Sequence, residues 1–84
     1  MRYDYFTLAY ACGVWRHEQG IRQSRIAEDL DLTSTSVSNF ERGKNNNAAV
    51  FLWYIKHGFT VEWYERFLNG KGDELTYYGE KRLR

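Results

Sequence analysis

Four short polar side chains near the middle of the chain share the spacing of one helix face: Ser34, Thr35, Ser38 and Asn39. Hydroxyl and amide groups both donate and accept hydrogen bonds, so this set can make directional contacts with an outside molecule. The serine and threonine run has no general base nearby and no phosphate-binding loop, so it does not predict nucleophilic catalysis. We therefore expect a binding surface here and not the active site of an enzyme.

A helix from about Ser34 to Arg42 is expected to carry these side chains. Val37 and Phe40 are its only apolar residues, and their spacing places them on one inward edge. Thr33 is a good N-cap, because its hydroxyl can accept a hydrogen bond from a free backbone N–H of the first turn. Serine, threonine and asparagine are poor helix formers, so an outer face made of them is unusual unless that face touches something.

A second helix is predicted just before this one, from Gln23 to Leu30. Its residues Ile26, Ala27 and Leu30 form a single inward stripe. The turn between the two helices is Asp31-Leu32-Thr33, and aspartate tolerates a left-handed backbone better than most residues. Two short helices joined by three or four residues have the spacing of a helix-turn-helix.

Three further helices and a tail account for the rest of the chain. The helices are expected from about Tyr5 to Gln19, from Asn47 to His57 and, with Thr60 as the cap, onward to Asn69. Residues 71–84 have no clear helical period. The predicted fold is therefore all-α: a compact five-helix bundle over residues 1–70, followed by a C-terminal tail over residues 71–84.

The length and the charge distribution indicate a single small domain that can carry a basic face. A chain of 84 residues predicts one domain, and a content of 18% aromatic residues supplies a large apolar area for a short sequence. The formal net charge is only +1, but the charges are segregated along the chain. Acids gather between Glu28 and Asp31, whereas Arg42 and Lys44 follow later. This distribution permits one basic face on a molecule that is nearly neutral.

Metal sites, cofactors and membranes are not expected. Cys12 is the one cysteine, so an intrachain disulfide and a zinc site built from the cysteines of one chain are both excluded. His17 and His57 lie far apart in the sequence, the first expected at the surface and the second partly buried. No stretch approaches the roughly 18 apolar residues of a membrane span, and the N-terminus does not read as a signal peptide. These features predict a cytoplasmic protein.

The features that stand out between Gln23 and Lys44 are Gln23, Ile26-Ala27, Leu30, Leu32-Thr33, Val37-Ser38 and Phe40-Glu41-Arg42-Gly43-Lys44. Together they resemble the phage repressor/Cro family of helix-turn-helix proteins, the lambda repressor-like DNA-binding domains. The likeness extends more weakly from Cys12 to Gly70. It implies a five-helix bundle whose third helix enters the major groove of double-stranded DNA. The chain departs from the family pattern at Asp31, at His57 and at Ser34-Thr35.

This resemblance implies a contact with DNA bases for the polar face. Asn39 can pair bidentately with an adenine, and Thr35 can offer its methyl group to a thymine methyl and its hydroxyl to a base edge. Ser34 and Ser38 lie on the same predicted face.

Phosphate contacts are expected around this face. Gln23 begins a helix, where free N–H groups and the helix dipole favour an anion. The other expected phosphate-contacting groups are the side chains of Arg22, Arg42 and Lys44 and the amides of Asn45 and Asn46. The family also implies a structural ion pair between Arg16 and Glu41.

A dimer is the expected binding form, because one short recognition helix reads few base pairs. Phe51, Leu52 and Ile55 form a second apolar stripe on their helix, and we expect them at a homodimer interface unless the tail covers them. The interface is expected at the end of this helix, at the fifth helix or at the tail over residues 71–84. The function predicted from all of this is a bacterial or phage-encoded transcriptional repressor. The alternative is a protein-interaction module, or an antitoxin-like protein, that keeps the helix-turn-helix fold. Any inducing signal is expected to come from a protein partner or antirepressor, from a peptide or from a change in the level of the protein.

Overall fold

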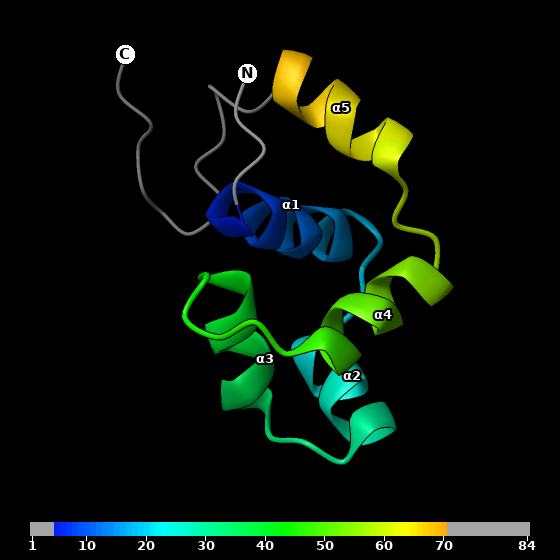
Figure 1. Ribbon diagram of the computed structural model, residues 1–84. Helices are drawn as coiled ribbons and strands as arrows, with labels where there is room; N and C mark the ends of the chain where they lie inside the picture. The colour runs from blue at the N-terminus through cyan, green and yellow to red at the C-terminus, as the bar shows by residue number, and fades with distance from the viewer. Residues whose placement is uncertain (1–4, 71–84) are drawn as a thin grey trace.

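The computed structural model describes residues 5–70, which form five α-helices and no strand (Figure 1). The helices are α1 (Tyr5–Glu18), α2 (Gln23–Leu30), α3 (Ser34–Glu41), α4 (Ala48–Lys56) and α5 (Val61–Gly70). This part of the chain is therefore all-α, as predicted, and each helix end lies within one residue of its predicted position. The predicted tail over residues 71–84 lies outside the described residues.

Helix α1 lies at the centre, with α5 packed on one side and α3 on the other (Figure 1). Helix α4 also contacts α1, and α2 packs against both α3 and α4. Large rings fill the space between these helices. Trp15 of α1 meets the rings of Tyr54 and Phe59 edge-on, with centroids 6.0 and 6.1 Å apart. Such edge-to-face pairs stabilise a small core beyond the area that they bury.

The connection between α2 and α3 has the local geometry that the sequence predicts. Asp31 adopts a left-handed backbone, with φ 59° and ψ 45°. The N–H of Leu32 then donates to the carbonyl of Ala27 at 2.8 Å, which closes the end of α2. Thr33 caps α3, because its Oγ1 accepts from the N–H of Ser36 at 3.1 Å. The predictions for Asp31 and Thr33 are confirmed.

Helix α4 divides its apolar residues between the core and the surface. Val50, Trp53 and Tyr54 are buried, whereas Leu52 and Ile55 are 56% and 41% exposed. The second stripe therefore reaches the surface as expected at those two positions. Phe51 differs, because it is partly buried and packs against the core.

His57, expected to be partly buried, is instead exposed at the end of α4. Its ring stacks on the buried Trp53 ring, with centroids 3.8 Å apart. The imidazole therefore covers the indole face from outside and takes no place in the core. His17 is exposed, as expected.

Across residues 5–70 no helix combines the length and the apolar character that crossing a membrane requires.

Candidate nucleic-acid interface

The outer face of α3 is set by two core residues on its inner edge. Val37 and Phe40 are completely buried, and the Phe40 ring stacks on Tyr54 with centroids 6.1 Å apart. Ser34 and Thr35 are therefore turned to the outside and are exposed, while Ser38 and Asn39 are partly buried. The structure thus places the four predicted base-contacting residues on a helix whose orientation is fixed by its packing.

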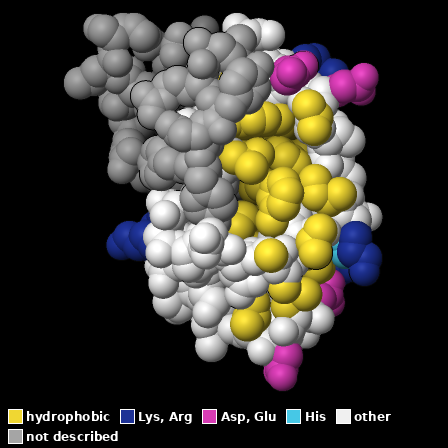
Figure 2. All heavy atoms as spheres, viewed as in Figure 1, with side chains coloured by type: hydrophobic (Ala, Val, Ile, Leu, Met, Phe, Trp, Pro, Cys, Tyr) yellow, Lys and Arg dark blue, Asp and Glu magenta, His cyan; other side chains and the backbone are white. Residues whose placement is uncertain are grey.

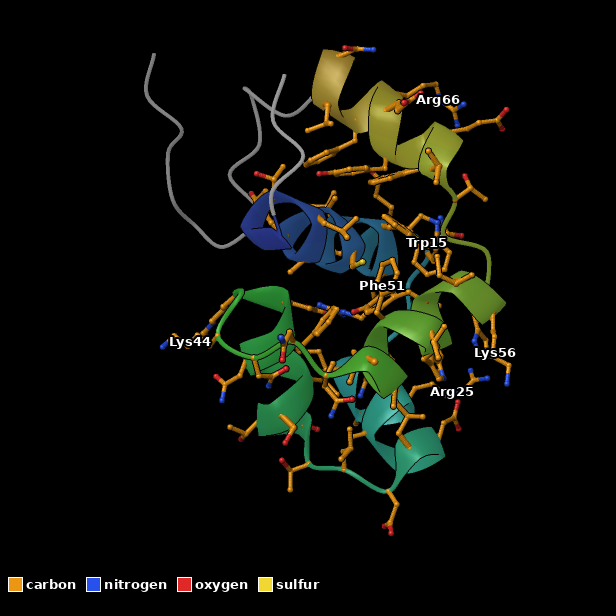
Figure 3. All side chains as sticks on the ribbon, in the orientation of Figure 1. Trp15, Arg25, Lys44, Phe51, Lys56 and Arg66 are labelled. Atoms are coloured by element: carbon orange, nitrogen blue, oxygen red, sulfur yellow. The ribbon has the colours of Figure 1, made fainter. Side chains whose placement is uncertain are left out.

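Two exposed cations follow this face directly. Arg42 is the C-cap residue of α3, and Gly43 next to it has a φ of 77°, which turns the chain away from the helix axis. The N–H of Lys44 donates to the carbonyl of Asn39 at 2.8 Å. Figure 3 shows the Lys44 side chain pointing away from the body of the molecule beyond the end of α3. The exposed guanidinium and ammonium groups give this end of the face a positive charge.

The loop after Lys44 is held by asparagine side chains. Asn45 donates from Nδ2 to the carbonyl of Ser36 at 3.3 Å, and its Oδ1 accepts from the N–H of Asn47 at 3.1 Å. Asn47 in turn caps α4, since its Oδ1 accepts from the N–H groups of Ala49 and Val50. The sequence analysis did not predict that the Asn45 side chain holds this loop. The available signal was the pair Asn45 and Asn47, two residues apart just before a helix. Asn46 is exposed.

Helix α2 begins without a side-chain cap. Arg22 occupies its N-cap position in an extended conformation and makes no capping hydrogen bond, whereas Thr33, Asn47 and Thr60 cap the next three helices. The Arg22 side chain is exposed. The first amides of α2 are thus not satisfied by a side chain of the N-cap residue, which is the condition under which a helix start attracts an anion.

A buried carboxylate connects α2 and α3 to the core. Glu41 is completely buried and accepts two hydrogen bonds from Arg16, from Nε at 2.7 Å and from Nη2 at 3.2 Å. It also accepts from Gln23 Nε2 at 3.0 Å and from the Tyr54 hydroxyl. Arg16 donates from Nη1 to the carbonyl of Ile21 at 2.7 Å. The structure therefore brings Arg16 and Glu41 together, as expected, and adds Gln23 and Tyr54, which the sequence did not indicate.

Burial near this carboxylate suppresses ionisation of two neighbouring groups. Burial raises the pKa of the Tyr54 hydroxyl, and the negative charge of Glu41 and the hydrogen bond to it raise the pKa further. Burial also raises the pKa of the Cys12 thiol, again with a contribution from Glu41. Since the thiolate is the reactive form, Cys12 is an inert core residue.

Arg25 lies away from this set. Its Nε is 3.5 Å from Asp29 Oδ2, and Trp53 donates to the same oxygen from Nε1 at 2.8 Å. Figure 3 shows Arg25 and Lys56 together on the side of the molecule opposite Lys44. Arg25 and Lys56 therefore do not add to the positive charge that Arg42 and Lys44 place at the end of α3.

A second exposed surface lies over α4 and α5. Figure 2 shows hydrophobic side chains gathered on one face across these helices. The exposed large hydrophobic residues of α4 and α5 are Leu52, Ile55 and Val61, which we call the α4–α5 apolar surface. Partly buried Phe51 packs beneath it, with its ring 6.5 Å from that of Phe59. Of the three residues predicted at a dimer interface, Leu52 and Ile55 are thus open to contact and Phe51 less so.

Within the described residues, no group of three or more His, Cys, Asp or Glu side chains could hold a metal ion. Glu41 accepts direct hydrogen bonds from Arg16, Gln23 and Tyr54.

No protein-family model matches this chain, and no curated protein or solved structure matches it either. The likeness to the phage repressor/Cro family therefore stays a prediction from the residues, and function has to be inferred from the site itself.

Proposed function

We propose that this chain is a sequence-specific regulator of transcription that binds double-stranded DNA, with α2 and α3 as a lambda repressor-like helix-turn-helix. The observation that carries the proposal is the outer face of α3. Ser34 and Thr35 are exposed at its start, and Arg42 and Lys44 are exposed just past its end. A short helix with small hydrogen-bonding groups outside and cations at its end suits the major groove, which is wide enough for one helix.

Base reading is assigned to the polar residues of this face. Asn39 would pair bidentately with an adenine, and Thr35 would contact a thymine methyl. Ser34 and Ser38 would contribute single hydrogen bonds to base edges. Short side chains reach only bases that lie close to the helix, so the proposal requires α3 to enter the groove deeply.

Phosphate contacts would fix the register of α3 on the duplex. Arg42, Lys44 and the amides of Asn45 and Asn46 would hold one strand beside the end of α3. Arg22 and Gln23, at the uncapped start of α2, would hold a phosphate on the other side of the groove.

Binding would require two copies of the chain. Proteins that read DNA with one short helix bind as two-fold dimers to half-sites about 34 Å apart. The α4–α5 apolar surface is the best available contact for a second copy, because Leu52, Ile55 and Val61 are all exposed large apolar side chains. Such a dimer on an operator would repress transcription by occluding polymerase.

The experiment is a selection of bound duplexes from a random oligonucleotide pool, followed by sequencing. We expect a two-fold symmetric motif to be enriched. On that motif Asn39→Ala is expected to cost about 1–3 kcal/mol of binding free energy. Asn69→Ala, at an exposed position near the end of α5, is the matched control and is expected to cost nothing. A pool that shows no enriched sequence would overturn the proposal.

A protein-interaction module is the second candidate, and the exposed α4–α5 apolar surface is the observation that favours it. An antitoxin-like protein would combine both functions, with α3 on DNA and this surface on a protein partner. Affinity for DNA that is weak, and that hardly changes with salt, would favour a pure interaction module.

A further inference from the structure

We propose that Glu41 is a positioning residue that holds the Gln23 amide in place as a hydrogen-bond donor to a DNA phosphate. The inference rests on the proposed DNA binding and gives Glu41 a role beyond its ion pair with Arg16. Gln23 is the first residue of α2 and Glu41 is the last residue of α3, and their side chains are joined by a hydrogen bond of 3.0 Å. The bond therefore links the start of one helix of the pair to the end of the other.

The chemistry of the two groups fixes the direction of the amide. A carboxylate can only accept hydrogen bonds, so Gln23 must turn Nε2 toward Glu41 and its own Oε1 away. The hydrogen bond uses one of the two Nε2 hydrogens. The second hydrogen has no acceptor among residues 5–70, and Gln23 is only partly buried. It is therefore left for an outside acceptor, which a phosphate oxygen supplies.

Glu41 is itself held in place, which makes it a rigid support. Arg16 binds both carboxylate oxygens, and the Tyr54 hydroxyl donates to Oε2. A free glutamine at the surface samples many rotamers and loses that freedom when it binds. The amide of Gln23 is ordered before DNA arrives, so the loss on binding is smaller.

The test uses a DNA fragment from the selection in which single phosphates are replaced by neutral methylphosphonates, one at a time. We expect one replacement to weaken binding of the natural chain by about tenfold, the size of one charge-assisted hydrogen bond. The same replacement is expected to weaken Gln23→Leu clearly less, because that variant has already lost the Gln23 contact and keeps only those of Arg22 and the start of α2. Glu41→Gln is expected to show the same reduced sensitivity at that phosphate as Gln23→Leu.

A control separates positioning from general stability. Phe67→Leu weakens the core at a buried position of α5, away from Glu41, and is expected to keep full sensitivity to the methylphosphonate. If Glu41→Gln does not fold, hydrogen exchange of the Gln23 side-chain amide in the natural chain takes its place. That amide is expected to exchange more slowly than the amide of exposed Gln19.

The outcomes are distinguishable. A natural chain that binds no DNA would overturn the proposed function. A chain that binds DNA while Gln23→Leu keeps full phosphate sensitivity would leave DNA binding intact and overturn the positioning role. Equal exchange at Gln19 and Gln23, or a loss of sensitivity in Phe67→Leu, would also overturn it.

Discussion

The Arg16 guanidinium and the Glu41 carboxylate meet in the interior through two hydrogen bonds, of 2.7 and 3.2 Å, and so join α1 to the last residue of α3. Their residues are 7% and 0% exposed. A charge at this depth is tolerated only with its partner, because desolvation of either ion alone is costly. The orientation of α3, and with it the polar face, thus depends on a pair of charges that is almost completely buried.

Removal of one partner of the Arg16–Glu41 pair should strongly lower the free energy of unfolding. Arg16→Met is expected to lower the free energy of unfolding by about 3–5 kcal/mol, since Glu41 would stay buried without its cation. Urea denaturation followed by circular dichroism measures the loss. Arg25→Met removes the exposed Arg25–Asp29 pair and is the matched control, with an expected loss below about 1 kcal/mol. Similar losses in the two variants would contradict this interpretation.

Stability should fall in alkaline solution. Cys12 and Tyr54 have raised pKa values in the folded chain, against ordinary values of 9.0 and 10.0. Well below pH 9 both groups are protonated whether the chain is folded or not, so their contribution is fully present. As the pH rises past those values the unfolded chain loses protons that the folded chain keeps. The free energy of unfolding then falls by about 1.4 kcal/mol per pH unit for each group.

Two variants separate the contributions to this alkaline loss. Cys12→Ala is expected to remove the part of the slope that begins near pH 9, and Tyr54→Phe the part that begins near pH 10. Urea denaturation at a series of pH values gives both slopes. Slopes equal to that of the natural chain in both variants would show that neither group is protected from ionisation.

Affinity for DNA should depend on salt in a way that reports the phosphate contacts. The logarithm of the binding constant is expected to fall linearly with the logarithm of the salt concentration, by about 0.9 per phosphate contact. Arg42→Gln and Lys44→Gln should each reduce that slope by about 1. Lys56→Gln, on the opposite side of the molecule, should not change it (Figure 3). If Lys56→Gln reduced the slope as much as Arg42→Gln and Lys44→Gln do, the assignment of the phosphate contacts to Arg42 and Lys44 would be contradicted.

The α4–α5 apolar surface should hold two copies together. Sedimentation equilibrium of the full chain is expected to show a dimer, and the double variant Leu52→Asn with Ile55→Asn is expected to be monomeric, because polar amides replace two exposed apolar side chains. Thr35→Asn, at an exposed position of α3, should stay dimeric. A dimer that survives the double variant would exclude this surface as the interface.

Helix positions were predictable because their signals are local. The residues at the helix ends, such as Thr33 and Asp31, act on backbone groups within a few positions along the chain. Val37 and Phe40 marked the inner edge of α3 by their spacing alone. The polar face opposite them followed from the same period.

The hydrogen-bond partners of Glu41 were harder to predict from the sequence. Its hydrogen bond to Gln23 joins residues 18 positions apart, and the bond to Tyr54 joins residues 13 apart. No local pattern encodes such distances, and only the resemblance to a known family indicated Arg16 as a partner. The prediction that His57 is partly buried is wrong for a related reason. Helical periodicity groups residues into stripes, but it does not say how far each stripe extends into the core.

The central claim, that the outer face of α3 lies against DNA, is tested most directly by nuclear magnetic resonance. Labelled protein would be titrated with the selected duplex, and the amide shifts followed residue by residue. We expect the largest changes at Ser34, Thr35, Ser38 and Asn39 and at the start of α2. Changes confined to α4 and α5, or no changes at all, would contradict the claim.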